Sequence, residues 1–167
     1  MLAMRAQPIS KGFTLIEILV VLLIVTILAG VTIARLPAFA QNADFEAETR
    51  RLQLLFTMAR QESILDSTEF GFRLTHNGYQ FLKYDDSSQS WEEAESPFQE
   101  RSLPDELKLV IKAESDGFSL MGENLPPVLI LSSGENTPFR LILQSRLAKT
   151  SRILMSEGYG EFVWDEQ

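Results

Sequence analysis

The chain has 167 residues and a net charge of −8, with 15 Lys and Arg against 23 Asp and Glu. This acidic balance disfavours phosphate backbones as partners, so we expect no nucleic-acid binding. The lack of cysteine excludes a disulfide framework, a thiolate metal site and a cysteine nucleophile. The length is sufficient for one small domain with its own core.

The first element is an apolar segment that begins after a basic leader. Residues 11–17 have the sequence KGFTLIE, and the 17 residues from Ile18 to Ala34 carry no charge. As a helix, residues 13–36 would be about 36 Å long, enough to cross about 30 Å of hydrocarbon. Arg5 and Lys11 precede it, so the N-terminus should stay in the cytoplasm and the C-terminal domain should be exported. Glu17 lies at the edge of this segment, where a carboxylate is costly and tends to be functional.

Two other interpretations of the segment stay open. In a cleaved secretory signal, Ala38-Phe39-Ala40 would be the cleavage site and the mature chain would begin at Gln41. The apolar run is longer than the about 7–15 residues of typical signals, and Glu17 would be unusual there. In a buried core helix, protein would have to surround the run on all sides, which a domain of this size cannot easily provide.

The KGFTLIE motif followed by an aliphatic run resembles the class III signal of type IV pilins and type II secretion pseudopilins. The resemblance implies that a prepilin peptidase cuts between Gly12 and Phe13 and that Phe13 is then methylated. It also makes Glu17 the acid used in assembly, with the N-terminal amine of a neighbouring subunit as its partner. In a simpler alternative, Glu17 only extends to the lipid headgroups. The implied location is the bacterial inner membrane, with a single span.

A second helical pattern follows Pro37, which should kink the helix or end its first section. Apolar or small residues recur at helical spacing and predict an amphipathic helix from about Asp44 to Leu65 whose apolar stripe packs on a sheet: Leu52, Leu55, Phe56, Ala59 and Ser63. We therefore divide the chain into a leader (1–12), a transmembrane and assembly helix (13–36), a helix continuation (37–66) and a periplasmic β-rich domain (67–167).

After Asp66 the apolar period changes to two, which predicts strands. Asn77-Gly78 predicts a type I′ hairpin turn, and the segment from Trp91 to Arg101 is acidic and irregular. The expected strands are 70–74, 79–84, 107–113, 118–121, 128–131, 139–143, 151–155 and 160–164. The predicted class is α+β, a long N-terminal helix followed by an antiparallel sheet or sandwich that packs on the helix.

Residues 129–141, LILSSGENTPFRL, resemble the minor pseudopilin family called type II secretion system protein H. FimT/FimU-type minor pilins share this domain. The resemblance implies a structural component of the periplasmic pseudopilus, near its tip, used in the export of folded proteins across the outer membrane. Its partners would be the major pseudopilin and other minor ones. From the residues themselves, Gly134 permits a positive φ and Pro138 suits a strand start, so we expect a hairpin-like connection rather than a ligand site.

The sequence gives no support for an enzyme. His76 is the only histidine and is expected in a solvated turn, and no G-x-S-x-G motif is present. One His without Cys leaves carboxylates as the other ligands, which suit calcium better than zinc. Asp85-Asp86, Asp116-Gly117 and the glutamates at 92, 93 and 95 are interpreted as turns and a solvated loop. We predict no catalytic residue, metal, cofactor or small-molecule substrate. The alternatives are a minor type IV pilin in pilus assembly or DNA uptake, and a secreted periplasmic protein cleaved after Ala40.

Overall fold

The computed structural model describes residues 14–113, 125–147 and 149–166, apart from the side chains of 31–42 and 166. One helix, α1, runs over 52 residues from Leu15 to Asp66. The chain divides into two compact units, Met1–Phe39 and Ala40–Gln167, and each is considered by itself.

The helix α1 continues through Pro37, so of the two outcomes expected at this proline, a kink or an end of the first section, the end does not occur. A proline removes one backbone hydrogen bond, and the helix-forming residues on both sides are numerous enough to maintain the helix. The predicted amphipathic part ends at Asp66, one residue beyond the expected Leu65. Within the described residues, no helix combines the length and the apolarity that a membrane crossing requires.

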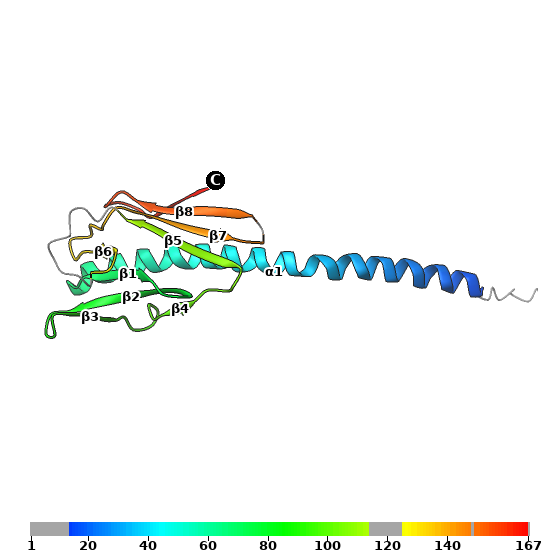
Figure 1. Ribbon diagram of the computed structural model, residues 1–167, viewed down its shortest axis with the longest axis horizontal. Helices are drawn as coiled ribbons and strands as arrows, with labels where there is room; N and C mark the ends of the chain where they lie inside the picture. The colour runs from blue at the N-terminus through cyan, green and yellow to red at the C-terminus, as the bar shows by residue number, and fades with distance from the viewer. Residues whose placement is uncertain (1–13, 114–124, 148, 167) are drawn as a thin grey trace, which may run out of the picture. The chain divides into compact units, whose positions relative to one another are not determined.

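In the described part of the chain, strands follow α1 and form two antiparallel sheets (Figure 1). Sheet A has the order β3-β2-β1-β6, and β4 also pairs with β2. Sheet B has the order β5-β7-β8-β9. The strands are β1 Phe70–Leu74, β2 Gly78–Asp85, β3 Ser90–Glu93, β4 Arg101–Ser102, β5 Leu107–Ala113, β6 Val128–Ile130, β7 Phe139–Ser145, β8 Thr150–Ser156 and β9 Val163–Glu166. The predicted α+β class, with a helix followed by antiparallel sheets, is confirmed.

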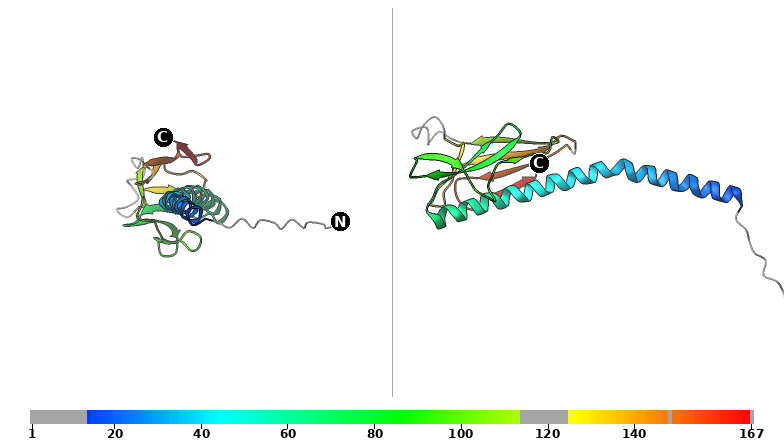
Figure 2. Two further views of the ribbon diagram at one scale, coloured as in Figure 1. Left: turned by 90° about the vertical axis from the view of Figure 1, so that its right-hand side faces the viewer. Right: turned by 90° about the horizontal axis from the view of Figure 1, so that it is seen from below.

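The C-terminal part of α1 runs along both sheets (Figures 1 and 2), and its apolar stripe packs against them. Phe56 is fully buried, and its ring centroid lies 4.8 Å from that of Phe72 in sheet A and 4.9 Å from that of Phe139 in sheet B. Leu52 and Ala59 are also fully buried. The helix and both sheets therefore share one core, and the prediction that this stripe packs on a sheet is confirmed.

The structure corrects two expectations about the strands. The segment from Trp91 to Arg101 is not irregular throughout, because β3 begins before it and β4 ends just after it. β3 is an edge strand with mostly exposed side chains, so it lacks the apolar alternation by which strands are recognised. The expectation that 139–143 is the return strand of 128–131 is also wrong, because β6 pairs with β1 in sheet A and β7 belongs to sheet B. The expected hairpin-like connection is confirmed, since Ile130 forms an antiparallel bridge with Asn136 and the Thr137 N–H donates to the Leu129 carbonyl at 2.9 Å. The expected strand at 118–121 lies outside the described residues.

The hairpin between β1 and β2 exists, but its turn is not type I′. Thr75 N–H donates to the Gly78 carbonyl at 3.0 Å, and neither Asn77 nor Gly78 has a positive φ. Gly78 is instead the first residue of β2 and pairs with Ser102. A Cβ on Gly78 would lie 1.9 Å from the Arg101 carbonyl oxygen, so glycine is required here by the close approach of β4 rather than by turn geometry.

We therefore expect Gly78→Ala to destabilise the Ala40–Gln167 unit by about 1–3 kcal/mol, because backbone has to move to accept the methyl group. Gly160→Ala is a poor control, since Gly160 has a φ of +83°. Gly30→Ala is suitable, because a Cβ there meets no atom within 4 Å. Urea unfolding of the full chain in detergent, followed by tryptophan fluorescence, measures the unfolding midpoints of Gly78→Ala and of the control Gly30→Ala. An unchanged midpoint for Gly78→Ala would contradict the packing argument.

Candidate functional site

The N-terminus of α1 is organised around Thr14 and Glu17. The Glu17 N–H donates to the Thr14 hydroxyl at 3.3 Å and to the Thr14 carbonyl at 3.1 Å. Thr14 is therefore the N-cap, and Glu17 occupies the first helical turn, where a negative charge interacts favourably with the helix dipole. The other two predicted site residues, Gly12 and Phe13, lie outside the described residues.

The residues that follow Glu17 form a helix that is apolar on every side. Large apolar side chains from Leu15 to Leu28 are all exposed, with exposed fractions of 80% at Leu15, 58% at Leu22 and 62% at Leu28. No ion pair of the Glu17 carboxylate occurs among the described residues. A helix that is apolar all round is normally covered by protein or lipid. These residues are therefore the strongest candidate for an interaction site.

The sequence candidates for chemistry that the structure describes are not brought together in one site. His76 is exposed in the turn between β1 and β2, as predicted. Across the residues that the structure describes, no group of three or more His, Asp or Glu side chains could hold a metal ion. Asp116 and Gly117 lie outside those residues.

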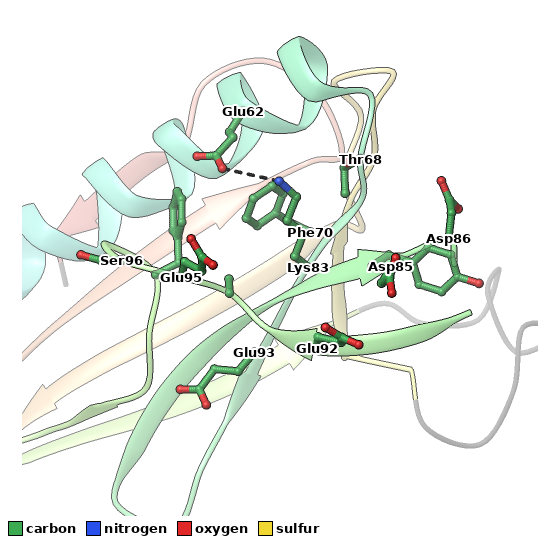
Figure 3. A pocket seen from close by; sticks show the side chains of 13 residues that line it. Glu62, Thr68, Phe70, Lys83, Asp85, Asp86, Glu92, Glu93, Glu95 and Ser96 are labelled. Carbon is green, nitrogen blue, oxygen red and sulfur yellow. Dashed lines mark ion pairs between the residues drawn. The ribbon is translucent and has the colours of Figure 1, made fainter. Parts of the chain in front are cut away.

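An acidic hollow of about 510 Å³ lies beside β2 and β3 (Figure 3). We call its carboxylates the acidic edge: Glu62, Asp85, Asp86, Glu92, Glu93 and Glu95. Lys83 is placed among them, with Nζ 3.2 Å from an Asp66 oxygen and 3.8 Å from a Glu62 oxygen. The Ser87 N–H donates to Asp85 at 3.0 Å and lowers the pKa of that carboxyl. Asp85 therefore orders the turn after β2. Two neighbouring carboxylates are also engaged, since Glu92 accepts from the Ser88 hydroxyl at 3.3 Å and Glu93 accepts from the Glu100 N–H at 3.0 Å.

A buried ionic group, which the sequence analysis missed, joins α1 to sheet A. Glu48 is 2% exposed and accepts hydrogen bonds from the Tyr79 hydroxyl at 2.5 Å and from Arg101 Nε at 3.0 Å. Burial, together with the bond to Glu48, raises the pKa of Tyr79 well above its usual range, so Tyr79 stays a neutral donor. The sequence did contain a signal for the burial of Glu48, because this residue falls at helical spacing between Phe45 and Leu52 on the apolar stripe.

Comparisons with known proteins match both the N-terminal apolar segment and the domain that follows it. Residues 9–33 match the prokaryotic N-terminal methylation motif, and residues 48–158 match the family described as type II transport protein GspH. Type II secretion system protein H of Pseudomonas aeruginosa is 34% identical over 149 residues, which cover 82% of this chain and 84% of that protein. The chain belongs to the GspH family. It is accordingly a minor pseudopilin of the type II secretion system.

Further relatives of this GspH-family chain extend the agreement. The protein H of Pectobacterium carotovorum is 29% identical over 95% of this chain and 94% of its own length. Among solved structures, the minor pseudopilin EpsH of Vibrio cholerae aligns with a TM-score of 0.60 at 19% identity, covering 74% of this chain and 97% of that one. The solution structure of Escherichia coli GspH aligns with a TM-score of 0.54 at 17% identity, covering 79% and 92%. These structures support the fold.

The stretch at 129–141, which resembled this family, has a structural role in the GspH-type domain. Asn136 and Thr137 are 5% and 2% exposed. The Thr137 hydroxyl accepts from Leu129 N–H at 3.1 Å, and Asn136 Oδ1 accepts from the Ser156 hydroxyl at 3.1 Å. Gly134 has a φ of +86°, as expected. The polar groups of the loop thus connect β6 of sheet A to β8 of sheet B.

Proposed function

We propose that this chain is made as a precursor that a prepilin peptidase cuts between Gly12 and Phe13, after which Phe13 is methylated. Residues 13–36 then hold it in the bacterial inner membrane, with the N-terminus at the cytoplasmic side and the Ala40–Gln167 unit in the periplasm. Removal of residues 1–12 deletes Arg5 and Lys11 and creates an amine at Phe13. The match to the methylation motif supports this processing.

The observation that carries the proposal is the exposure of the apolar residues from Leu15 to Leu28. Such a surface is unfavourable in water and is stable in hydrocarbon before assembly and against neighbouring helices after it. The alternative of cleavage after Ala40 is less compatible with α1, which is helical at residues 38–40, since proteases bind their substrates in extended form.

Glu17 would act in assembly. A carboxylate in an apolar environment requires a partner, and the new amine of Phe13 on a neighbouring subunit is a cation of the right kind. Glu17 lies in the first turn of α1 and four residues after Phe13 in the sequence, which supports this role. The pair would set the register between neighbouring helices, a use of buried charge that is known from other helical assemblies.

In the assembled system, we assign the chain a structural role near the tip of the periplasmic pseudopilus, in contact with the major pseudopilin and other minor ones. The pseudopilus would serve the export of folded proteins across the outer membrane. This assignment rests on membership of the GspH family. It requires no catalytic residue, cofactor or small-molecule substrate.

Mass spectrometry of the mature protein from a secreting strain tests the proposal. We expect the N-terminal peptide to begin at Phe13 and to carry one methyl group. A strain without the prepilin peptidase is the control, and the chain should begin at residue 1 there. A mature chain that begins at Gln41 would refute membrane anchoring through residues 13–36.

A further inference from the structure

The turn between β7 and β8 carries two cations and an exposed leucine, although the net charge of the chain is −8. We call it the basic turn and define it by Arg146, Leu147 and Lys149. Both cations are exposed, and Leu147 is 57% exposed. None of the ion pairs among the described residues involves Arg146 or Lys149. The basic turn therefore presents positive charge on both sides of an exposed apolar side chain.

The basic turn lies at the end of the Ala40–Gln167 unit where α1 enters it. In β8, Arg152 Nη1 lies 2.9 Å from a Glu46 oxygen. Phe162 comes just before β9, which pairs antiparallel with β8, so it lies by the far end of β8. Its carbonyl accepts from Gln53 Nε2 at 2.9 Å. β8 and α1 therefore run alongside each other in the same direction, and the turn before β8 lies beyond Glu46, toward the start of the unit.

The acidic edge lies at the opposite end of the unit. α1 ends at Asp66, and Lys83 Nζ is 3.2 Å from an Asp66 oxygen and 3.8 Å from a Glu62 oxygen. Asp85 and Asp86 of the acidic edge follow Lys83 directly and line the same hollow. An anionic surface would repel this end and attract the basic turn, so it would orient the unit.

The attraction of the basic turn alone is modest, because acids lie next to it. The Arg146 N–H donates to the Glu106 carbonyl at 2.9 Å, and Arg146 lines one hollow together with Asp105 and Lys108. Three cations thus face two acids around the turn. Such a surface binds weakly from solution, but a partner to which the chain is already tethered is present at high effective concentration.

The lipid bilayer is a partner of this kind. Under the proposed function residues 13–36 lie in the membrane, and only residues 37–43 separate them from Asp44. Basic side chains beside an apolar one are typical of segments that lie at a bilayer surface, where the cations contact phosphate groups and the apolar side chain enters the acyl boundary. A free phosphate ion would leave Leu147 in water.

We propose that the basic turn binds the anionic headgroups of the membrane that anchors the chain, before the subunit enters the pseudopilus. The proposal rests on the anchoring in the proposed function and goes beyond it, because it gives the Ala40–Gln167 unit its own membrane contact. The contact would hold the acidic edge away from the membrane and would have to break during assembly. Salt should weaken it, because its charges are exposed.

Fluorescence of the full chain in lipid vesicles tests this contact, since the chain has no cysteine and a single label can be attached. Leu147→Cys carries an apolar, polarity-sensitive fluorophore. In vesicles of phosphatidylcholine with phosphatidylglycerol, we expect blue-shifted emission and quenching by spin-labelled lipid. In vesicles of phosphatidylcholine alone, both effects should be at least severalfold smaller. The same label at Ser88→Cys, in the exposed turn before β3, should be quenched in neither.

Charge reversal makes the test specific. Arg146→Glu with Lys149→Glu should lower the ratio of bound to free turns at least about tenfold, because each basic side chain near an anionic surface contributes about fivefold. Lys112→Glu with Arg140→Glu is the matched control, since it changes the net charge equally at exposed positions of the same sheet. Arg140 is about 20 Å from Arg146 along β7, beyond the range of screened charges, so this control should bind as the native chain does.

A label at Val25→Cys separates a failure of this contact from a failure of anchoring. Val25 is 55% exposed on the apolar helix, and spin-labelled lipid should quench it in both kinds of vesicle. An unquenched label there would refute the anchoring itself. With Val25 quenched, the contact is overturned if the Leu147 label responds equally to neutral and anionic vesicles, or if the Ser88 label is quenched as strongly. Release of the turn by inorganic phosphate at constant ionic strength would show a phosphate site instead and would also overturn it.

Discussion

Gly12→Val is expected to leave the full-length precursor uncut and to abolish its contribution to secretion. A peptidase that cuts after residue 12 has to admit the backbone there in extended form, and a branched side chain at that position blocks the approach. Immunoblotting should show a single band at the size of the precursor, without the smaller mature form. Secretion of a folded substrate should fall in the same cells.

Gly30→Val is the matched control for this prediction. It places the same side chain in the apolar helix that follows the cleavage site, at a position where a Cβ meets no atom within 4 Å. This variant should be cut as efficiently as the native chain. If Gly12→Val is still processed to begin at Phe13, the assignment of the cleavage site is wrong.

Glu48→Ala is expected to destabilise the Ala40–Gln167 unit by about 2–4 kcal/mol. It leaves the hydroxyl of Tyr79, which is 1% exposed, without its acceptor, and it removes the partner of Arg101. Because the Arg101 side chain is 39% exposed, water can compensate part of the loss. Both tryptophans, Trp91 and Trp164, lie in this unit, so their fluorescence during urea unfolding of the full chain in detergent reports its stability.

Glu46→Ala provides the comparison on the same helix. Glu46 accepts from Arg152 Nη1 at 2.9 Å, but its side chain is 41% exposed. A partly exposed pair contributes at most about 1 kcal/mol, so this variant should unfold close to the native midpoint. Equal losses for the two glutamates would show that burial of Glu48 is not the source of its effect.

Local patterns predicted the elements whose side chains alternate or repeat against the core. The stripe of Leu52, Phe56 and Ala59 indicated the amphipathic helix, and β1 and β5 have the expected bounds. The patterns failed to predict strands and pairings that depend on which strands lie next to each other in a sheet. β3 is an exposed edge, and β6 joins β1 rather than its neighbour in sequence. Such pairings depend on contacts between residues that are distant in the chain.

The functional residues likewise fall into those that the sequence predicted and those that only the structure revealed. The sequence by itself determined the KGFTLIE motif, the uncharged run after it and the position of Glu17, because these features are contiguous and depend on no other part of the chain. Only the tertiary structure decided that Glu48 is buried with Tyr79 and Arg101, that Gly78 faces the Arg101 carbonyl, and that the basic turn lies at the end of its unit where α1 enters. The physical reason is that burial, strand register and charge juxtaposition are set by packing between the helix and two sheets, which no local spacing specifies.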